Sequence, residues 1–386
     1  SDANSIGSTM TGGDGNDTFA NYSSTGSTMT GGEGDDNIRS YSSTGSTMTG
    51  GDGNDYLYSE SSIESTVTGG NGNDTLFIYG GSNNTVQDNE GDDALVVYFN
   101  NDITLTAGVG NDNLFSYYGA NNTLTGGDGN DALYSYYGSN STLTGGDGND
   151  TLLSQGNNNT LTGGNGLDVF DIYSNYGTGT ANGGADDDKF NVFYRSSAVT
   201  ITTGDGQDTI NLQYAEQGSV ALVVTDFTAG AGGDKFVLDA TTNGVLSGLT
   251  AWDGSSNPFG AGLLQLVQNS SDTELQWDRD GAGAGTWETL VVFQNTTATA
   301  FTADNLTPAY DPNGAAPVGE TINGTEIGET LNGTIGNDTI FALGGDDVVN
   351  AGAGADIVDA GTGADTVHGG PGDDVLFGGS DTDYDY

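Results

Sequence analysis

The amino-acid sequence predicts an all-β fold: a parallel β-roll (β-solenoid), an interrupting small antiparallel β-domain and a second, shorter β-roll. The first observation behind this prediction is a Gly-Gly-x-Gly-x-Asp phrase that begins at Gly12, Gly31, Gly50 and Gly69, in steps of 19 residues. The second is that each period holds two hydrophobic positions, about nine or ten residues apart. A fixed period of this length is typical of solenoids, in which each repeat forms one coil.

The phrase continues to residue 203, with small changes in step. Its later starting points are Asp88, Ala107, Gly126, Gly145, Gly163, Gly183 and Thr203, and the last three steps are 18, 20 and 20 residues. One hydrophobic column lies two residues after the aspartate, from Phe19 to Ile210, and the other lies between threonines, from Met10 to Ile201. We therefore expect two short strands per coil, each with a hydrophobic side chain inward and polar neighbours outward.

The repeats predict four segments. Residues 1–216 form the 19-residue-repeat roll, and residues 217–306, which contain all three tryptophans and Asp-Gly turns, form a small antiparallel β-domain. Residues 307–319 hold three of the five prolines and read as a linker. Residues 320–386 follow a nonapeptide register, so two nonapeptides make one coil and the phrase occurs on both edges of the second roll.

Composition excludes several classes of function. The 386 residues include 54 acidic against five basic side chains, a net charge of −49, which would repel nucleic acid and anionic membranes. Cysteine is absent, and no apolar run is long enough for membrane insertion. Because the chain starts without Met or a signal segment and both ends fall on repeat boundaries, we expect a processed chain or an excerpt of a longer protein.

The repeated phrase has the chemistry of a calcium site. Ca²⁺ prefers six to eight oxygen ligands, which carboxylates and backbone carbonyls supply, and glycine allows the positive-φ turns that bring carbonyls together. Stacked coils place equivalent aspartates about 4.8 Å apart, where each pair repels by roughly 3–4 kcal/mol at an effective dielectric constant near 20. The sequence therefore predicts multiple Ca²⁺ ions between successive turns.

The stretches "GGDGNDTLL", "GGNGNDTLF" and "GGPGDDVLF" resemble the nonapeptide of the RTX (hemolysin-type) calcium-binding β-roll family. The resemblance implies that turn carbonyls and the aspartate bind Ca²⁺, shared between successive turns of one edge, and that the chain leaves the cell by type I secretion. Residues 222–306 also resemble the C-terminal region of some RTX surface proteins. The predicted metal ligands are Gly12, Asp14, Gly15, Asp17, Gly31, Glu33, Asp36, Gly50, Asp52, Asp55, Gly69, Asn71, Asp74, Asp93, Asp112, Gly126, Asp128, Asp131, Gly145, Asp147, Asp150, Gly163, Asn165, Asp168, Asp188, Asp205, Asp208, Asp338, Asp347, Asp356, Asp365, Asp374 and Asp383.

Three sites depart from the pattern, and we expect them to be weak or empty. The coil at residue 88 reads "DNEGDD" without the leading glycines, Asp186 stands where glycine is expected, and Glu329 replaces the aspartate. The 19-residue step also exceeds the 18 residues usual in the resembling family. The extra length belongs to a far edge made of Asn, Ser and Thr turns in place of a second calcium turn.

Several outward features have both a structural and a functional interpretation. The Thr-x-Thr ladder, interrupted only by Gln87, is either an ice-binding array or a row of good strand formers. A column of tyrosines is either a binding surface for carbohydrate or a neighbouring subunit, or a stack that stabilises adjacent coils. Its members are Tyr22, Tyr41, Tyr79, Tyr98, Tyr117 and Tyr136, with Glu60 and Gln155 at the same position of their coils. The stretch from Asp278 to Glu288 is a hairpin turn or an incomplete EF-hand loop, and His368 is expected at the surface.

No catalytic motif accompanies the repeats, so we predict that the chain is not an enzyme. The function predicted is that of a secreted calcium-binding structural protein of the cell surface, a surface-layer or extracellular matrix or filament subunit. It would fold and assemble with identical subunits on extracellular Ca²⁺. The alternatives are an RTX adhesin for a cell-surface glycan, an ice-binding β-solenoid, and a fragment of a toxin or hydrolase.

Overall fold

The computed structural model describes residues 6–173, 178–193, 196–213, 218–239, 243–281 and 287–379. Its contacts divide the chain into two units, Ser1–Phe227 and Thr228–Tyr386.

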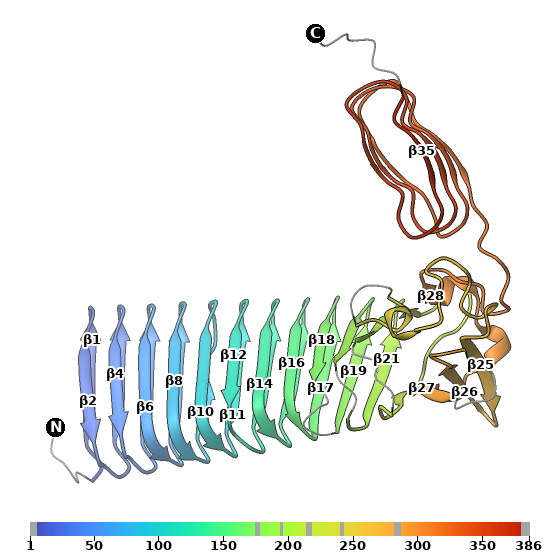
Figure 1. Ribbon diagram of the computed structural model, residues 1–386. Coiled ribbons are helices and arrows are strands. Elements are labelled where there is room, and N and C mark those ends of the chain that lie inside the picture. The colour runs from blue at the N-terminus through green and yellow to red at the C-terminus, as the bar shows by residue number, and fades with distance from the viewer. Residues whose placement is uncertain are drawn as a thin grey trace. The chain divides into compact units, whose positions relative to one another are not determined.

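The first unit is a parallel β-solenoid, in which each coil gives one strand to each of two sheets (Figure 1). One sheet contains β1 (Thr9–Asp14), β3 (Thr28–Glu33), β5 (Thr47–Asp52), β7 (Thr66–Asn71), β9 (Thr85–Gln87), β11 (Thr104–Val109), β13 (Thr123–Asp128), β15 (Thr142–Asp147), β17 (Asn159–Asn165), β19 (Gly179–Ala185), β21 (Val199–Asp205) and β23 (Leu222–Val224). The other contains β2 (Thr18–Tyr22), β4 (Asn37–Tyr41), β6 (Tyr56–Ile63), β8 (Thr75–Ser82), β10 (Ala94–Asn101), β12 (Asn113–Tyr117), β14 (Ala132–Ser139), β16 (Thr151–Asn157), β18 (Val169–Tyr173), β20 (Lys189–Phe193) and β22 (Thr209–Gln213). The predicted parallel roll is confirmed.

The register between coils follows the sequence period. Met29 pairs with Met48 in one sheet, and Leu114 pairs with Leu133 in the other. Both predicted hydrophobic columns point inward and are buried from the second coil onward, and Ile78, Val97, Ile172, Val192 and Leu212 add to this core. This core is narrow, and neighbouring coils therefore supply most of the contacts of each coil.

The edge of the first roll opposite the glycine phrase carries an uncharged polar ladder. The Asn122 side-chain oxygen accepts the backbone N–H of Ile103 at 3.2 Å, and its Nδ2 donates to the Ser116 hydroxyl at 2.8 Å. Two coils later the Asn159 side-chain oxygen accepts the N–H of Ser141 at 2.9 Å. Amides and hydroxyls thus hold the buried part of this edge together, which agrees with the Asn, Ser and Thr turns expected there.

The second unit begins with a small β-domain. The strands β25 (Leu264–Asn269), β26 (Asp272–Trp277) and β27 (Glu288–Phe293) form an antiparallel sheet, while β24 (Lys235–Val237) pairs in parallel with β28 (Leu306–Thr307). Its short 3-10 helices are η1 (Leu246–Gly248), η2 (Ala298–Ala300) and η3 (Ala303–Asn305). The stretch predicted as a hairpin or EF-hand loop connects β26 to β27, and residues 282–286 of it lie outside the described residues.

The start of the proline-rich segment lies against this domain. Tyr310 is buried and meets Trp252 edge to face, with ring centroids 6.4 Å apart. The Asn257 Nδ2 donates to the backbone oxygens of Asp311 at 2.8 Å and Ala315 at 2.7 Å. These contacts hold residues 310–315 in place.

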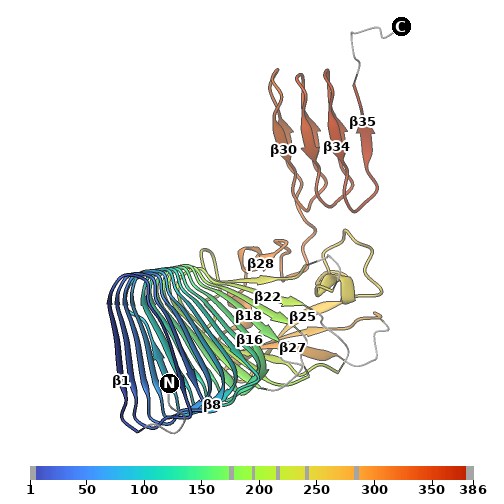
Figure 2. The same cartoon turned by 90° about the vertical axis from the view of Figure 1, so that its left-hand side faces the viewer.

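A shorter second roll completes the described chain (Figure 2). One of its sheets contains β29 (Thr321–Asn323), β31 (Thr339–Phe341), β33 (Ile357–Asp359) and β35 (Val375–Phe377), and the other contains β30 (Thr330–Asn332), β32 (Val348–Asn350) and β34 (Thr366–His368). Thr321 pairs with Thr339, which confirms a coil of two nonapeptides. The core is small: Leu331, Ile340, Ala342, Val349, Ala351 and Val358.

Candidate metal centre

Each Gly-Gly-x-Gly-x-Asp phrase forms the turn at one edge of a coil. Gly127 and Gly129 illustrate why glycine is needed, because their φ angles are +136° and +142°. A Cβ on either residue would also stand closer than 3.0 Å to a backbone oxygen of the preceding coil. The turn therefore requires residues that tolerate a left-handed backbone and a close approach of the neighbouring chain.

The aspartates that end the phrases form a hydrogen-bonded ladder. The backbone N–H of Asp112 donates to the Oδ1 of Asp131 at 2.8 Å, and the N–H of Asp131 donates to the Oδ1 of Asp150 at 2.8 Å. The same bond joins, coil after coil, Asp17, Asp36, Asp55, Asp74, Asp93, Asp112, Asp131, Asp150, Asp168, Asp188 and Asp208. From Asp36 onward, each of these side chains reaches back to the preceding coil.

An exposed ladder runs in the opposite sense beside it. The N–H of Asn130 donates to the Oδ1 of Asn111 at 3.0 Å, and the N–H of Asn149 donates to the Oδ1 of Asn130 at 2.7 Å. Here the side chain of the earlier coil reaches forward. Each turn is thus held from both sides, and the buried carboxylate is fixed in position.

The second oxygen of the buried aspartates has no protein partner. The Oδ2 atom is buried and makes no hydrogen bond at Asp17, Asp36, Asp55, Asp74, Asp93, Asp112, Asp131, Asp150, Asp168 and Asp188. It lies directly above the first glycine of its own phrase: a Cβ on Gly126 would stand closer than 3.0 Å to both the Asp131 Oδ2 and the Gly145 backbone oxygen. A buried oxygen of this kind costs free energy unless a proton or a cation satisfies it.

The electrostatics of the ladder agree with this requirement. Burial, reinforced by repulsion from the adjacent ladder aspartates, raises the pKa of Asp112 to about 7, the pKa of Asp150 to about 7 and the pKa of Asp188 to about 8. The backbone N–H donors oppose these shifts but do not cancel them. Near neutral pH, the ladder therefore attracts a counter-charge in place of the proton.

The second roll repeats the arrangement on both of its edges. On one edge the N–H of Asp338 donates to the Oδ1 of Asp356 at 2.8 Å, and on the other the N–H of Asp347 donates to the Oδ1 of Asp365 at 2.9 Å. The Oδ2 atoms of Asp347, Asp356 and Asp365 are buried without a hydrogen-bond partner. Both rolls thus offer carboxylate and carbonyl oxygens, the donor set that suits Ca²⁺.

The structure divides the sequence-predicted ligands into two groups. The first glycines and the last aspartates of the phrases meet at the buried oxygens, as at Gly126 and Asp131. The second group consists of the side chains at the third position of the phrase, the first x of Gly-Gly-x-Gly-x-Asp. These side chains are exposed: Asp14, Glu33, Asp52, Asn71, Asp128, Asp147, Asn165 and Asp205. Of the remaining predicted ligands, Gly15 is a turn glycine with a φ of +97°. The Oδ1 of Asp374 accepts the N–H of Asp356 at 3.0 Å and so belongs to the ladder of the second roll. Asp383 lies outside the described residues.

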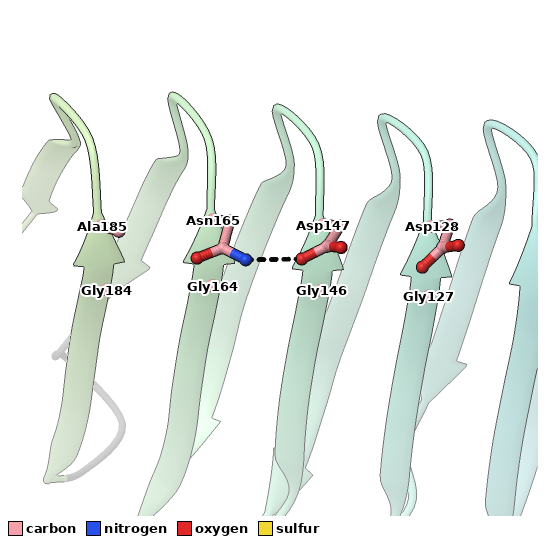
Figure 3. Close-up of a pocket in the computed structure, with 8 residues that line it drawn as sticks. All are labelled: Gly127, Asp128, Gly146, Asp147, Gly164, Asn165, Gly184 and Ala185. Atoms are coloured by element: carbon pink, nitrogen blue, oxygen red, sulfur yellow. Dashed lines mark hydrogen bonds between the residues drawn. The ribbon is translucent and has the colours of Figure 1, made fainter.

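The third-position column lines a shallow groove of about 500 Å³ along the turns (Figure 3). Its lining residues are Gly127, Asp128, Gly146, Asp147, Gly164, Asn165, Gly184 and Ala185. Within it the Nδ2 of Asn165 donates to the Oδ1 of Asp147 at 2.6 Å. These side chains are solvated, so they contribute charge near the turns without the burial of the ladder.

The departures from the phrase keep the turn but change its chemistry. Asp186 adopts a φ of +76° and its Oδ2 accepts the N–H of Gly166 at 3.2 Å. The Glu329 Oε1 accepts the backbone N–H of Thr325 in its own turn. Sequence reasoning missed Asp88, whose buried side chain lies beside the ladder residues Asp74 and Asp93. Its position in the first-glycine column was the signal that could have found it.

Comparison with protein families agrees with this geometry. The model for the RTX calcium-binding nonapeptide repeat (4 copies) matches residues 8–20, 45–61, 65–77, 107–136, 137–170, 323–358 and 351–385. A search of curated proteins gave no match. Among the described residues, no helix has the length and apolar character needed to cross a membrane. The matched segments lie in both rolls, where buried aspartate ladders line the turns, so the chain contains RTX calcium-binding nonapeptide repeats, which bind multiple Ca²⁺ ions.

Proposed function

We propose that the chain is a secreted structural protein of the cell surface that folds and assembles when it meets extracellular Ca²⁺. The observation that carries the proposal is the continuous column of buried Oδ2 atoms without hydrogen-bond partners. Without ions, folding would bring these carboxylates together at a cost; with ions, the free energy of binding becomes free energy of folding. Low Ca²⁺ inside a cell and millimolar Ca²⁺ outside would then separate the unfolded from the folded chain.

A structural role fits the composition of the site. Most buried polar groups described in the first roll are carboxylates of the ion-binding edge and uncharged Ser and Asn side chains. The single histidine, His368, is exposed. Repeats of this family are typically not catalytic. We therefore propose that the ions support the fold and take no part in a reaction.

Circular dichroism during a Ca²⁺ titration tests the folding part of the proposal. We expect little strand signal in excess chelator and a cooperative gain of signal as Ca²⁺ is added, with Mg²⁺ as the control because it demands six ligands in near-octahedral geometry. A full strand signal in chelator at pH 8 would contradict the proposal. Electron microscopy of the same samples tests assembly, since sheets or filaments should form with Ca²⁺ only.

The aromatic surface favours self-assembly or adhesion as the way in which the roll meets its partners. The rings of Tyr98 and Tyr117 stack with centroids 4.4 Å apart, and those of Tyr117 and Tyr136 with centroids 5.0 Å apart. A neighbouring column of Phe99 and Tyr118 is about half exposed. Stacked rings that remain accessible suit contact with a second subunit or with the apolar face of a sugar ring. Binding on a glycan array would favour an adhesin over a lattice subunit.

The opposite sheet supports the ice-binding alternative. Thr123 pairs with Thr142 and Thr125 pairs with Thr144, so the threonines form a regular two-row array. The array is interrupted at Gln87, whose Nε2 donates to the Thr68 hydroxyl at 3.3 Å. Thermal hysteresis that disappears when outward threonines are replaced by bulky residues would favour this function over the structural one.

A further inference from the structure

The coil that begins at Asp88 lacks the first glycine of the phrase and carries a carboxylate there. At an ordinary position such as Gly50, the atoms nearest to a hypothetical Cβ are the Asp55 Oδ2 and the Gly69 backbone oxygen of the next coil. At Gly69 the nearest atoms are the Oδ2 of Asp74 and the Oδ2 of Asp88. A carboxyl group thus stands where the other coils present a backbone carbonyl.

Three carboxylates converge as a result. One oxygen from each of Asp74, Asp88 and Asp93 lies within 4.8 Å of the others, and the three residues are 2%, 4% and 1% exposed. The Oδ2 of each is buried and has no hydrogen-bond partner. The sequence contains no lysine or arginine between Arg39 and Lys189, so no basic side chain of the surrounding coils balances the cluster.

The Asp88 side chain is held in this position. Its Oδ1 accepts the backbone N–H of Gly70 at 2.8 Å and that of Asn89 at 2.9 Å. The Oδ1 atoms of Asp74 and Asp93 accept the ladder N–H groups of Asp55 at 2.6 Å and Asp74 at 2.7 Å. The remaining oxygens are therefore fixed as a set, which lowers the cost of bringing them to one ion.

We propose that Asp74, Asp88 and Asp93 form a cation site distinct from the ladder sites, which fills first and favours trivalent over divalent hard cations more strongly than they do. Oxygen-ligand affinity for Ca²⁺ increases with the number of charged ligands, and the attraction of a third carboxylate increases with the charge of the ion. The coil expected from sequence to be weak or empty becomes the strongest site. The inference rests on the same ion-binding edge as the proposed function but concerns only the order and selectivity of filling.

Calorimetric titration of the full chain with Tb³⁺, at saturating Ca²⁺, tests the site. In the wild type we expect one equivalent of Tb³⁺ to displace one Ca²⁺ in a first step at least about tenfold tighter than the steps that follow. Asp88→Gly, which gives the coil the residue found at Gly69, and Asp88→Asn should both lose that step. Ala107→Gly, at the same position in the next coil and without a change of charge, should keep it.

Three results would overturn the inference: no distinct first step in the wild type, a first step that survives in Asp88→Gly, or an Asp88→Gly chain that binds one ion more than the wild type. The last result would mean that the Asp88 carboxylate fills the place of the ion. The wild-type titration decides the question even where a variant does not fold. A chain whose strand signal ignores Ca²⁺ would contradict the proposed function instead, so the two failures are distinguishable by circular dichroism.

Discussion

Acidification in the presence of chelator should restore the fold that removal of Ca²⁺ abolishes. Burial, with repulsion among neighbouring carboxyls, raises the pKa of Asp74, Asp112 and Asp150 to about 7 and the pKa of Asp88 and Asp188 to about 8, against an ordinary value of 3.8. Because the folded-state pKa lies above the unfolded one, the folded state binds the protons, and its stability falls as pH rises through the folded-state pKa.

The size of the effect follows from the number of protons taken up. Each proton bound on folding changes the free energy of unfolding by about 1.4 kcal/mol per pH unit. Two of the five carboxyls therefore give about 2–3 kcal/mol between pH 7 and pH 6. That change is a large fraction of the stability of an ordinary domain. With saturating Ca²⁺ the sign reverses, because protons then compete with the ion for the same oxygens.

The measurement is far-ultraviolet circular dichroism at constant ionic strength, from pH 8 to pH 5, in chelator and in Ca²⁺. In chelator the strand signal should rise as pH falls, and in Ca²⁺ the thermal midpoint should fall. Matched double variants separate the ladder from the overall charge: Asp131→Asn with Asp150→Asn removes two ladder carboxyls, and Asp128→Asn with Asp147→Asn removes two exposed ones. A strand signal in chelator that does not change with pH would refute the reasoning. The same change of strand signal with pH in both double variants would also refute it.

Three further predictions concern single positions. Gly126→Ala places a Cβ against the Asp131 Oδ2 and the Gly145 oxygen. The Ca²⁺ concentration at the midpoint of folding should therefore rise, and denaturant unfolding in Ca²⁺ should show a loss of about 1–3 kcal/mol. An unchanged Ca²⁺ midpoint would contradict the assigned site. Asn122→Ala leaves the N–H of Ile103 without its acceptor, so the free energy of unfolding should fall by about 1–3 kcal/mol. The number of bound Ca²⁺ ions, measured by equilibrium dialysis, should not change. A lower number would show that the far edge binds metal. Tyr117→Ser removes the stacks with Tyr98 and Tyr136, worth about 0.5–1.5 kcal/mol each, and should lower the thermal midpoint in Ca²⁺ without shifting the Ca²⁺ titration.

Much of the first roll follows from the sequence because its period is explicit. The step of 19 residues fixes which side chains stack, and the alternation about Leu114 and Leu133 fixes which of them face inward. The tyrosine column is confirmed for the same reason, including the place of Glu60 between Tyr41 and Tyr79.

Other features could not be predicted from the sequence because they depend on the local backbone conformation. Phe99 and Tyr118 have φ angles of +54° and +57°, so simple strand alternation does not predict that their rings stack, with centroids 5.1 Å apart. The sequence also shows that a carboxylate is present at Asp88 without showing which way it points. Its direction depends on the backbone N–H groups of Gly70 and Asn89, which belong to two different coils.

The two edges of the first roll differ in how they accommodate a change of length. Where the step shortens to 18 residues, the pairing of β14 with β16 shifts between Tyr136 and Ser139, on the amide-lined side. The ladder bond across the shortened step, from the N–H of Asp150 to the Oδ1 of Asp168, stays at 2.8 Å. Insertions and deletions are thus absorbed away from the carboxylates. A lineage carrying such repeats can gain or lose whole coils, and tolerate an odd residue within one, while the spacing of its ion column stays constant.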